Sequence, residues 1–152
     1  MKNRIAIGAL SLSAIGLLVI AKFEGYSETV YQPLPGDKPT AGFGHADERL
    51  SLGARVTSMQ ALEWLQSDIS EAEKAVKTCV KVPLTQGEFD AFVSFTFNVG
   101  GKAFCESTLV KRVNAQDYAG ACSELSRWVY FKGKPIPGLT RRRLEELKMC
   151  KK

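Results

Sequence analysis

Residues 1–22 differ in composition from the rest of the chain, and they constrain its fold most. Lys2 and Arg4 precede residues 5–21, which contain no charged side chain. As a helix, those residues would span about 25 Å at about 1.5 Å per residue, somewhat less than a bilayer core of about 30 Å. Gly, Ala and Ser dilute the Ile, Leu and Val residues, so insertion into a membrane would be weak. The positive residues predict an export signal with its N-terminus in the cytoplasm and the rest of the chain outside.

Two other interpretations of this segment stay open. A cleaved signal peptide would have small residues in an A-x-A-like pattern after the apolar stretch, and residues 18–24 (LVIAKFE) fit that pattern poorly. The second interpretation is a helix buried in the folded domain. Both this helix and a membrane span could be correct, at different times in the life of the protein. We therefore expect the segment to stay uncleaved.

The length and charge of the chain restrict its class only loosely. One domain, or one compact domain with two lobes, suits 152 residues. A formal net charge of +5 favours a polyanionic partner, either nucleic acid or a cell-wall polymer, although an ordinary basic soluble protein would have the same charge. The run 141–143 (RRR) indicates nucleic acid only weakly, because Leu139, Leu144 and Leu147 fit a helix that keeps the arginines mainly on its solvent side.

Cysteines and prolines divide the remaining chain. Four cysteines, at positions 79, 105, 122 and 150, form no C-x-x-C pair, and export favours disulfides; spacing alone leaves all three pairings open. Residues 30–44 are rich in Pro and Gly, with Val30, Tyr31, Thr40 and Phe43 between them. This pattern predicts short strands joined by tight turns, which would form a small β-lobe.

Helices are predicted after this lobe. Thr57 with Gln60 is a capping-box pattern ahead of a long amphipathic helix, and Thr85 with Glu88 is a second one, ahead of a helix that is apolar nearly all round and stops at residues 100–101 (GG). Further helices are expected at about 107–114, 117–128 and 140–150. The prediction is an α+β fold, a small β-sheet lobe plus a helical lobe with a natural cleft between them.

Carboxylates are the best candidates for chemistry. His45 is the only histidine, which disfavours a Ser-His-Asp triad and a multi-histidine metal site. Glycosidic cleavage needs a carboxylic acid to protonate the leaving oxygen and usually a second carboxylate. Glu24 follows the apolar segment, so it would lie at a helix end where partial burial keeps it a usable acid. By themselves, Asp37 would be a turn residue and Thr40 a strand residue.

Together these residues are similar to a known family. Glu24-Gly25-Tyr26, Tyr31 and residues 36–45 (GDKPTAGFGH) resemble the active-site region of the phage-type lysozymes, glycoside hydrolase family 24. That family carries a catalytic Glu, then an Asp and a Thr, and the Thr opens a T-x-G-x-G-H turn that residues 40–45 match one by one. The resemblance continues in residues 92–100 (FVSFTFNVG), 107–109 (STL), Trp128 and 138–143 (GLTRRR), and covers nearly the whole chain after residue 22.

The resemblance implies a role for each site residue. Glu24 would be the general acid, Asp37 would position or activate the attacking water, and Thr40 would hydrogen-bond that water. The bond cleaved would be the β-1,4 link between N-acetylmuramic acid and N-acetylglucosamine, with inversion of the anomeric centre. The implied partner is the glycan of peptidoglycan and not nucleic acid, no metal or organic cofactor is implied, and the released protein would be a monomer. Similar lysozymes pair the cysteines equivalent to Cys122 and Cys150, which leaves Cys79 for Cys105.

One departure from the family concerns the second acid. The commoner spacing puts the Asp nine residues after the Glu and six before the Thr, where this chain has Pro33 and Leu34. Asp37 is the nearest carboxylate, three residues before Thr40, and Glu28 is a distant alternative. A catalytically inactive lysozyme-like module that only binds peptidoglycan is therefore the alternative function. A small pore-forming membrane protein would explain the first 22 residues and leave the motif unexplained.

Some phage lysozymes also carry a signal-arrest-release segment, a weak transmembrane helix that later leaves the bilayer. Residues 1–22 resemble it, and residues 23–152 would be the lysozyme domain. Glu24 is three residues from Ala21, so in the membrane-bound state it would stay within about 10 Å of the apolar end, at about 3.5 Å per residue. The protein would first be inactive at the inner membrane, held by residues 5–21 and facing the periplasm, and later soluble in the periplasm. The released segment would become a helix that packs on the domain and leads into Glu24.

Overall fold

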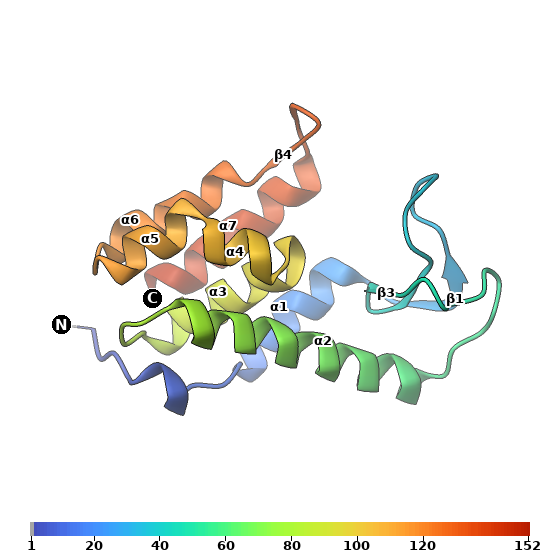
Figure 1. The fold of residues 1–152 in the computed structure, drawn as a ribbon, viewed down its shortest axis with the longest axis horizontal. Coiled ribbons are helices and arrows are strands. Elements are labelled where there is room, and N and C mark those ends of the chain that lie inside the picture. Colours follow the sequence, from blue (N-terminus) through green and yellow to red (C-terminus); the bar gives the residue numbers. More distant parts are fainter. Residues whose placement is uncertain (1) are drawn as a thin grey trace. The chain divides into compact units, whose positions relative to one another are not determined.

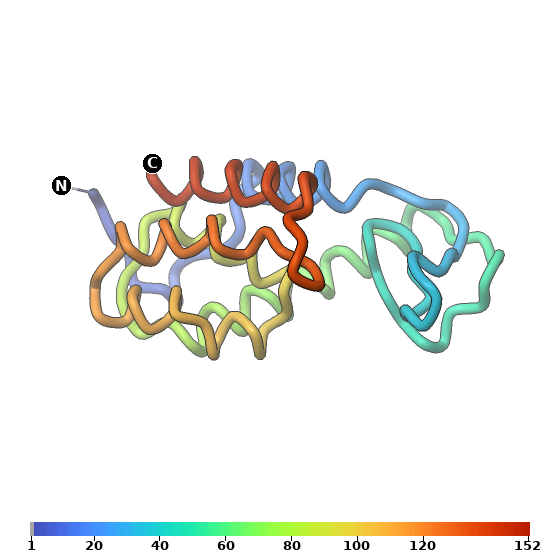
Figure 2. The backbone as a smooth tube through the Cα atoms, turned by 90° about the horizontal axis from the view of Figure 1, so that it is seen from above, coloured from blue at the N-terminus to red at the C-terminus, as the bar shows by residue number. Residues whose placement is uncertain are grey.

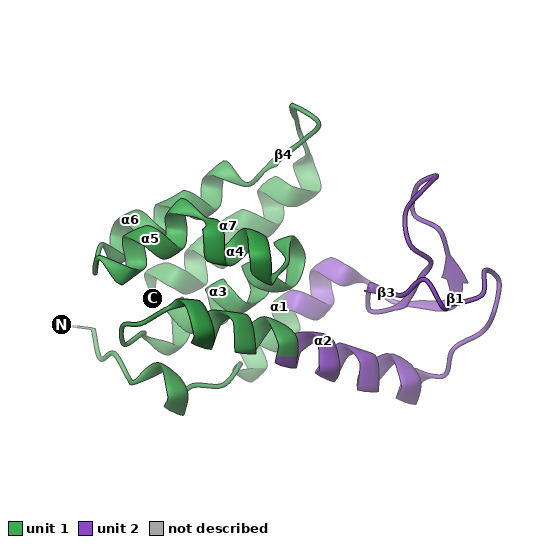
Figure 3. Cartoon of the chain, in the orientation of Figure 1, with its two compact units in different colours: residues 1–19, 71–152 green, residues 20–70 purple. Residues whose placement is uncertain are grey.

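The chain divides into two compact units in a computed structural model that describes residues 2–152. Figure 3 colours them green and purple: residues 1–19 with 71–152, called here the helical unit, and residues 20–70, called the β unit. Helices α1 (Ala14–Glu24) and α2 (Ser58–Cys79) each begin in one unit and end in the other.

The β unit contains the predicted small sheet. Strands β1 (Ser27–Tyr31), β2 (Thr40–Gly42) and β3 (His45–Ala46) form an antiparallel sheet in the order β1-β2-β3, with Tyr31 opposite Thr40. In the capping box expected at α2, the Thr57 N–H donates to the Gln60 side chain at 3.0 Å, and the Gln60 N–H donates back to the Thr57 hydroxyl at 3.2 Å. The predictions of the β-lobe and of the α2 start are confirmed.

The helical unit is built around α3 (Gln86–Val99), which packs against α7 (Pro137–Lys151) (Figures 1 and 2). Every residue of α3 from 88 to 96 is buried, and its Thr85–Glu88 capping box is present, as predicted. The unit's other elements are the short 3-10 helix η1 (Ile7–Ala9), α4 (Gly101–Glu106), α5 (Thr108–Asn114), α6 (Tyr118–Glu124), the 3-10 helix η2 (Leu125–Arg127), β4 (Tyr130–Phe131) and β5 (Lys134–Pro135). Two disulfides lie in this unit, Cys79–Cys105 and Cys122–Cys150, which are the pairs that the resemblance implies.

Helix α4 and the hairpin of β4 and β5 were not predicted. Gly100 ends α3 with a φ of +89°, as expected of a glycine, but the chain begins α4 directly at Gly101. The predicted helix over residues 117–128 stops earlier, and an antiparallel hairpin of β4 and β5 follows. The last helix begins at Pro137, about three residues before the predicted start at 140, because proline is favoured in the first turn of a helix.

The expectation that the arginine run faces solvent is wrong for two of its three members. Arg142 and Arg143 are 4% and 2% exposed, whereas Leu144 is 50% exposed. The reason is Glu146, which is fully buried and accepts from Arg142 Nε at 3.2 Å and from Arg143 Nη1 at 2.6 Å. Burial lowers the pKa of the Arg143 guanidinium, while the charge of Glu146 opposes that shift.

The N-terminal segment differs from the single helix predicted over residues 5–21. A helix does lead into Glu24, but α1 begins only at Ala14. Ile5 pairs with Leu84 in an antiparallel bridge, with N···O distances of 2.8 and 3.0 Å, so its backbone groups are satisfied without a helix. Among residues 2–152, no helix combines the length and the apolar character that a membrane span requires.

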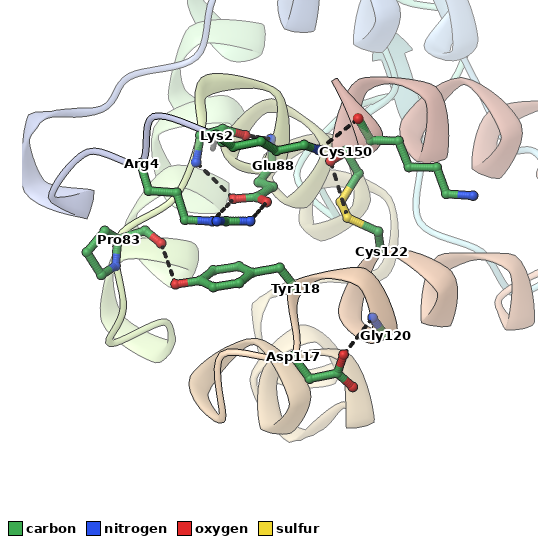
Figure 4. A network of polar contacts seen from close by, with 11 residues as sticks. Lys2, Arg4, Pro83, Glu88, Asp117, Tyr118, Gly120, Cys122 and Cys150 are labelled. Atoms are coloured by element: carbon green, nitrogen blue, oxygen red, sulfur yellow. Dashed lines mark hydrogen bonds and ion pairs between the residues drawn. A yellow bond between two sulfur atoms is a disulfide. The ribbon is translucent and has the colours of Figure 1, made fainter.

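The charged flank of this segment binds the helical unit, as Figure 4 shows. Arg4 donates to both oxygens of Glu88, at 2.7 and 3.1 Å, and its guanidinium lies 3.5 Å from the centre of the Tyr118 ring. Glu88 is 1% exposed, so Arg4 compensates a carboxylate that water does not reach. Lys2 Nζ donates to the carbonyl of Lys151 at the C-terminal end of α7, where the helix dipole favours a cation.

Candidate active site

Glu24 is the last residue of α1, and its side chain lies against the T-x-G-x-G-H turn. A Cβ atom on Gly44 would come within 2.5 Å of Glu24 Oε2. Gly44 also has a φ of +78°, a conformation that side chains disfavour. Two separate constraints therefore require glycine here, and one of them is the position of the Glu24 carboxylate.

The turn itself is held tightly to α2. Gly42 has a φ of +61°, and a Cβ atom there would lie 2.9 Å from the Cβ of Ala61 on α2. Thr40, at the start of β2, is 7% exposed and donates its hydroxyl proton to the carbonyl of Lys38 at 3.0 Å. The first glycine of the motif, Gly42, is thus needed for packing, and the threonine hydroxyl has a fixed orientation.

Asp37 lies in the loop between β1 and β2. Its N–H donates to the carbonyl of Leu34 at 3.0 Å, and its carbonyl accepts from Gln32 Nε2 at 2.8 Å, so both bonds hold the backbone of the turn. The side chain is exposed. Within residues 2–152 its carboxylate accepts no hydrogen bond, which leaves both oxygens available to water.

The structure thus brings the three predicted residues into one unit in different settings. Glu24 contacts the motif turn, Thr40 opens that turn, and Asp37 is in the adjoining loop. The role of each residue stays a prediction.

Sequence reasoning missed a further contact of the turn, which His45 makes with two residues of α2. His45 Nδ1 lies 2.9 Å from Asp68 Oδ2, and the His45 ring stacks on Trp64 with 4.7 Å between ring centroids. Trp64 and Asp68 are four residues apart on α2 and therefore share one face. That spacing, together with the single histidine at the end of the motif, is the signal that could have predicted this contact.

Known proteins resemble this chain over most of its length. The family model described as Phage lysozyme matches residues 21–146. An endolysin of Acyrthosiphon pisum secondary endosymbiont phage 1 is 40% identical over 141 residues, which cover 90% of this chain and 95% of that protein. A SAR-endolysin of Enterobacteria phage PA-2 is 30% identical over 150 residues, which cover 95% and 90%. The solved muramidase domain of SpmX from Asticaccaulis excentricus has a TM-score of 0.83 at 35% identity, and covers 92% of this chain and 97% of that one.

The helices, the small antiparallel sheet and the solved structure define a glycoside hydrolase with the α+β lysozyme fold, as predicted. The chain belongs to the phage lysozyme family. Peptidoglycan is the substrate that this family implies.

Proposed function

We propose that this protein is an endolysin that hydrolyses the β-1,4 bond between N-acetylmuramic acid and N-acetylglucosamine, with Glu24 as the general acid. The observation that carries the proposal is the contact between the Glu24 carboxylate and Gly44 of the motif turn. A proton donor must be held in place relative to the group that binds the nucleophilic water, and this turn begins with Thr40.

The hydroxyl of Thr40 supports a defined role. A hydroxyl has one proton to donate, and Thr40 gives that proton to the carbonyl of Lys38. It therefore presents lone pairs to a water molecule and accepts a hydrogen bond from it, which fixes the direction in which the water's own lone pair points. Asp37 would take the water's other proton, since its carboxylate is exposed in the adjoining loop. An inverting reaction needs space for that water between the two carboxyl groups, and an acid on a loop suits this requirement.

Product analysis tests the bond that is cleaved. The full-length protein is incubated with purified peptidoglycan, the new reducing ends are reduced with borohydride, and the sugars are identified by mass spectrometry. A muramidase yields reduced N-acetylmuramic acid. Reduced N-acetylglucosamine would contradict the assigned bond, and binding without any new reducing end would support the alternative, an inactive peptidoglycan-binding module.

We also propose that residues 1–22 are a signal-arrest-release segment, which holds the enzyme at the host inner membrane facing the periplasm until it becomes soluble there as a monomer. The charge-free stretch after Lys2 and Arg4 supports this topology, as does the likeness to a SAR-endolysin. The folded chain offers the released charges new partners, Lys151 and Glu88. Mass spectrometry of the soluble active species tests the proposal: an intact N-terminal segment is expected, and a chain that starts after residue 21 would mean an ordinary cleaved signal peptide.

A further inference from the structure

Helix α1 begins with half of a capping box in its own sequence. Ser13 is the N-cap residue: its carbonyl accepts from Leu17 N at 2.9 Å, and its hydroxyl accepts from Gly16 N at 3.2 Å. A complete capping box has a Glu or Gln three residues later, whose side chain accepts the N–H of the N-cap residue. That position is Gly16, which has no side chain.

Asp90 of α3 supplies the missing half. Its Oδ1 accepts from Ser13 N at 3.0 Å, and its Oδ2 accepts from the Ser13 hydroxyl. A Cβ atom on Gly16 would lie 3.0 Å from Cγ of Asp90 and 3.1 Å from its Cβ. The glycine therefore leaves space for the Asp90 carboxylate of α3. This carboxylate accepts the Ser13 N–H, as a Glu or Gln side chain at position 16 would in a complete capping box.

Two further side chains of the helical unit, Glu73 and Gln86, bind the same end of α1. Together with Asp90 they are called here the anchor of α1. The Leu12 N–H donates to Glu73 Oε1 at 2.6 Å. Gln86 Nε2 donates both to Asp90 Oδ1 at 2.9 Å and to the Ser11 carbonyl at 2.8 Å. Asp90 is 3% exposed, so its orientation is fixed by these bonds and not by solvent. Two carboxylates thus lie at the positive end of the dipole of α1.

This anchor decides where α1 starts. An uninterrupted helix through residues 5–21 would use the N–H groups of Leu12 and Ser13 for its own carbonyls. Glu73 and Asp90 bind those same groups, so the helix begins after them. The resulting helix α1 has 11 residues. Isolated helices become marginally stable only at about 12 to 15 residues, so α1 depends on contacts such as these at its N-terminus.

We infer that Asp90 is a positioning residue for Glu24: it completes the capping box of α1 from α3 and thereby keeps α1 formed up to its last residue, Glu24. This inference rests on the proposed role of Glu24. Asp90 acts only through the helix and does not touch the reacting groups.

The test uses the full-length chain with Asp90→Ala, Ser13→Ala and the double variant. Loss of the cap should speed amide exchange in the first turn of α1 about fivefold, as expected for a lost N-cap. The kcat on peptidoglycan should fall while KM stays unchanged, because substrate binding is not altered. The double variant should be no worse than the poorer single variant, since both residues belong to one capping box. Ser13→Thr, which keeps the hydroxyl, should restore kcat, and Glu71→Gln on the exposed side of α2 is the matched control.

Two results would overturn the inference. Unchanged exchange in α1 of both single variants would show that Asp90 does not cap the helix. Faster exchange with kcat unchanged, measured well below the melting temperature, would show that Asp90 stabilises the fold without positioning Glu24. If Asp90→Ala does not fold, the comparison of Ser13→Ala with Ser13→Thr decides. The proposed function fails separately, since that failure would appear as full activity of Glu24→Gln with the exchange results unaffected.

Discussion

The carboxylate of Glu24 occupies space that a side chain on Gly44 would need, since a Cβ atom there would lie 2.5 Å from Oε2. The glycine of the motif therefore does more than allow a tight turn. It sets the distance at which the acid can approach the turn.

The first prediction separates these two functions of the glycine. Gly44→Ala should cost about 1 to 3 kcal/mol in backbone strain and also displace the Glu24 carboxylate, so that wall lysis falls at least tenfold. Gly53→Ala is the matched control, because Gly53 has a φ of +80° in the same unit and no atom lies within 4 Å of an added Cβ. Thermal unfolding and a turbidity assay measure the two effects. Equal activity of the two variants at equal stability would contradict a role of Gly44 in placing Glu24.

The buried ion cluster of α7 gives a prediction about stability. Glu146 is fully buried between Arg142 and Arg143, and it also accepts from the Ser94 hydroxyl at 2.8 Å. Glu146→Gln removes the compensating charge, so we expect a loss of about 3 to 5 kcal/mol in the free energy of unfolding. Urea unfolding measures this loss. Glu145→Gln, one residue away and partly exposed, is the control and should cost under about 1 kcal/mol, the usual value for an exposed ion pair. Similar losses in both variants would contradict the role of the buried ion cluster in stability.

The third prediction concerns release from the membrane, and the structure shows which glycine to change. Gly8 has no atom within 4 Å of an added Cβ, whereas a Cβ on Gly16 would meet Leu12 and Asp90. Gly8→Leu should therefore strengthen membrane retention and delay lysis, while the purified soluble enzyme keeps its activity. Gly16→Leu should also lower the activity of the purified enzyme.

Cell fractionation with and without an ionophore measures this retention. Collapse of the membrane potential should hasten release, since a potential of 100 mV contributes roughly 2.3 kcal/mol per charge and the terminal amine, Lys2 and Arg4 all feel it. Normal lysis timing with Gly8→Leu, or release that is insensitive to the potential, would contradict the signal-arrest-release proposal.

Local patterns in the sequence predicted local structure well. The capping box of Thr85 and Glu88 identified the start of α3, because both its members lie in one turn. The motif at residues 40–45 identified the turn that Glu24 contacts, because its glycines are required by backbone conformation. Both signals depend on residues that are close in sequence.

The misses depend on partners far away in the sequence. The break in the N-terminal helix needs Asp90, which is 77 residues from Ser13, and Glu73, which is 61 residues from Leu12. Arg142 and Arg143 bind Glu146 of the same helix. Glu146 in turn accepts from the hydroxyl of Ser94 on α3 at 2.8 Å, and the carbonyl of Ser94 accepts from Arg142 at 3.2 Å. The hydrophobic pattern of one segment cannot reveal such partners, because they lie on other elements of the chain.

The most direct test of the central claim is the kcat of Glu24→Gln on purified peptidoglycan. The amide keeps the size of the side chain and cannot donate the acid's proton, so we expect activity below a tenth of wild type with an unchanged melting temperature. Glu28→Gln, an exposed acid of β1 paired with Arg55, is the control and should keep full activity, while Asp37→Asn should be impaired. Glu24→Gln activity above a tenth of wild type, in a fully folded protein, would contradict the assignment of Glu24 as the general acid.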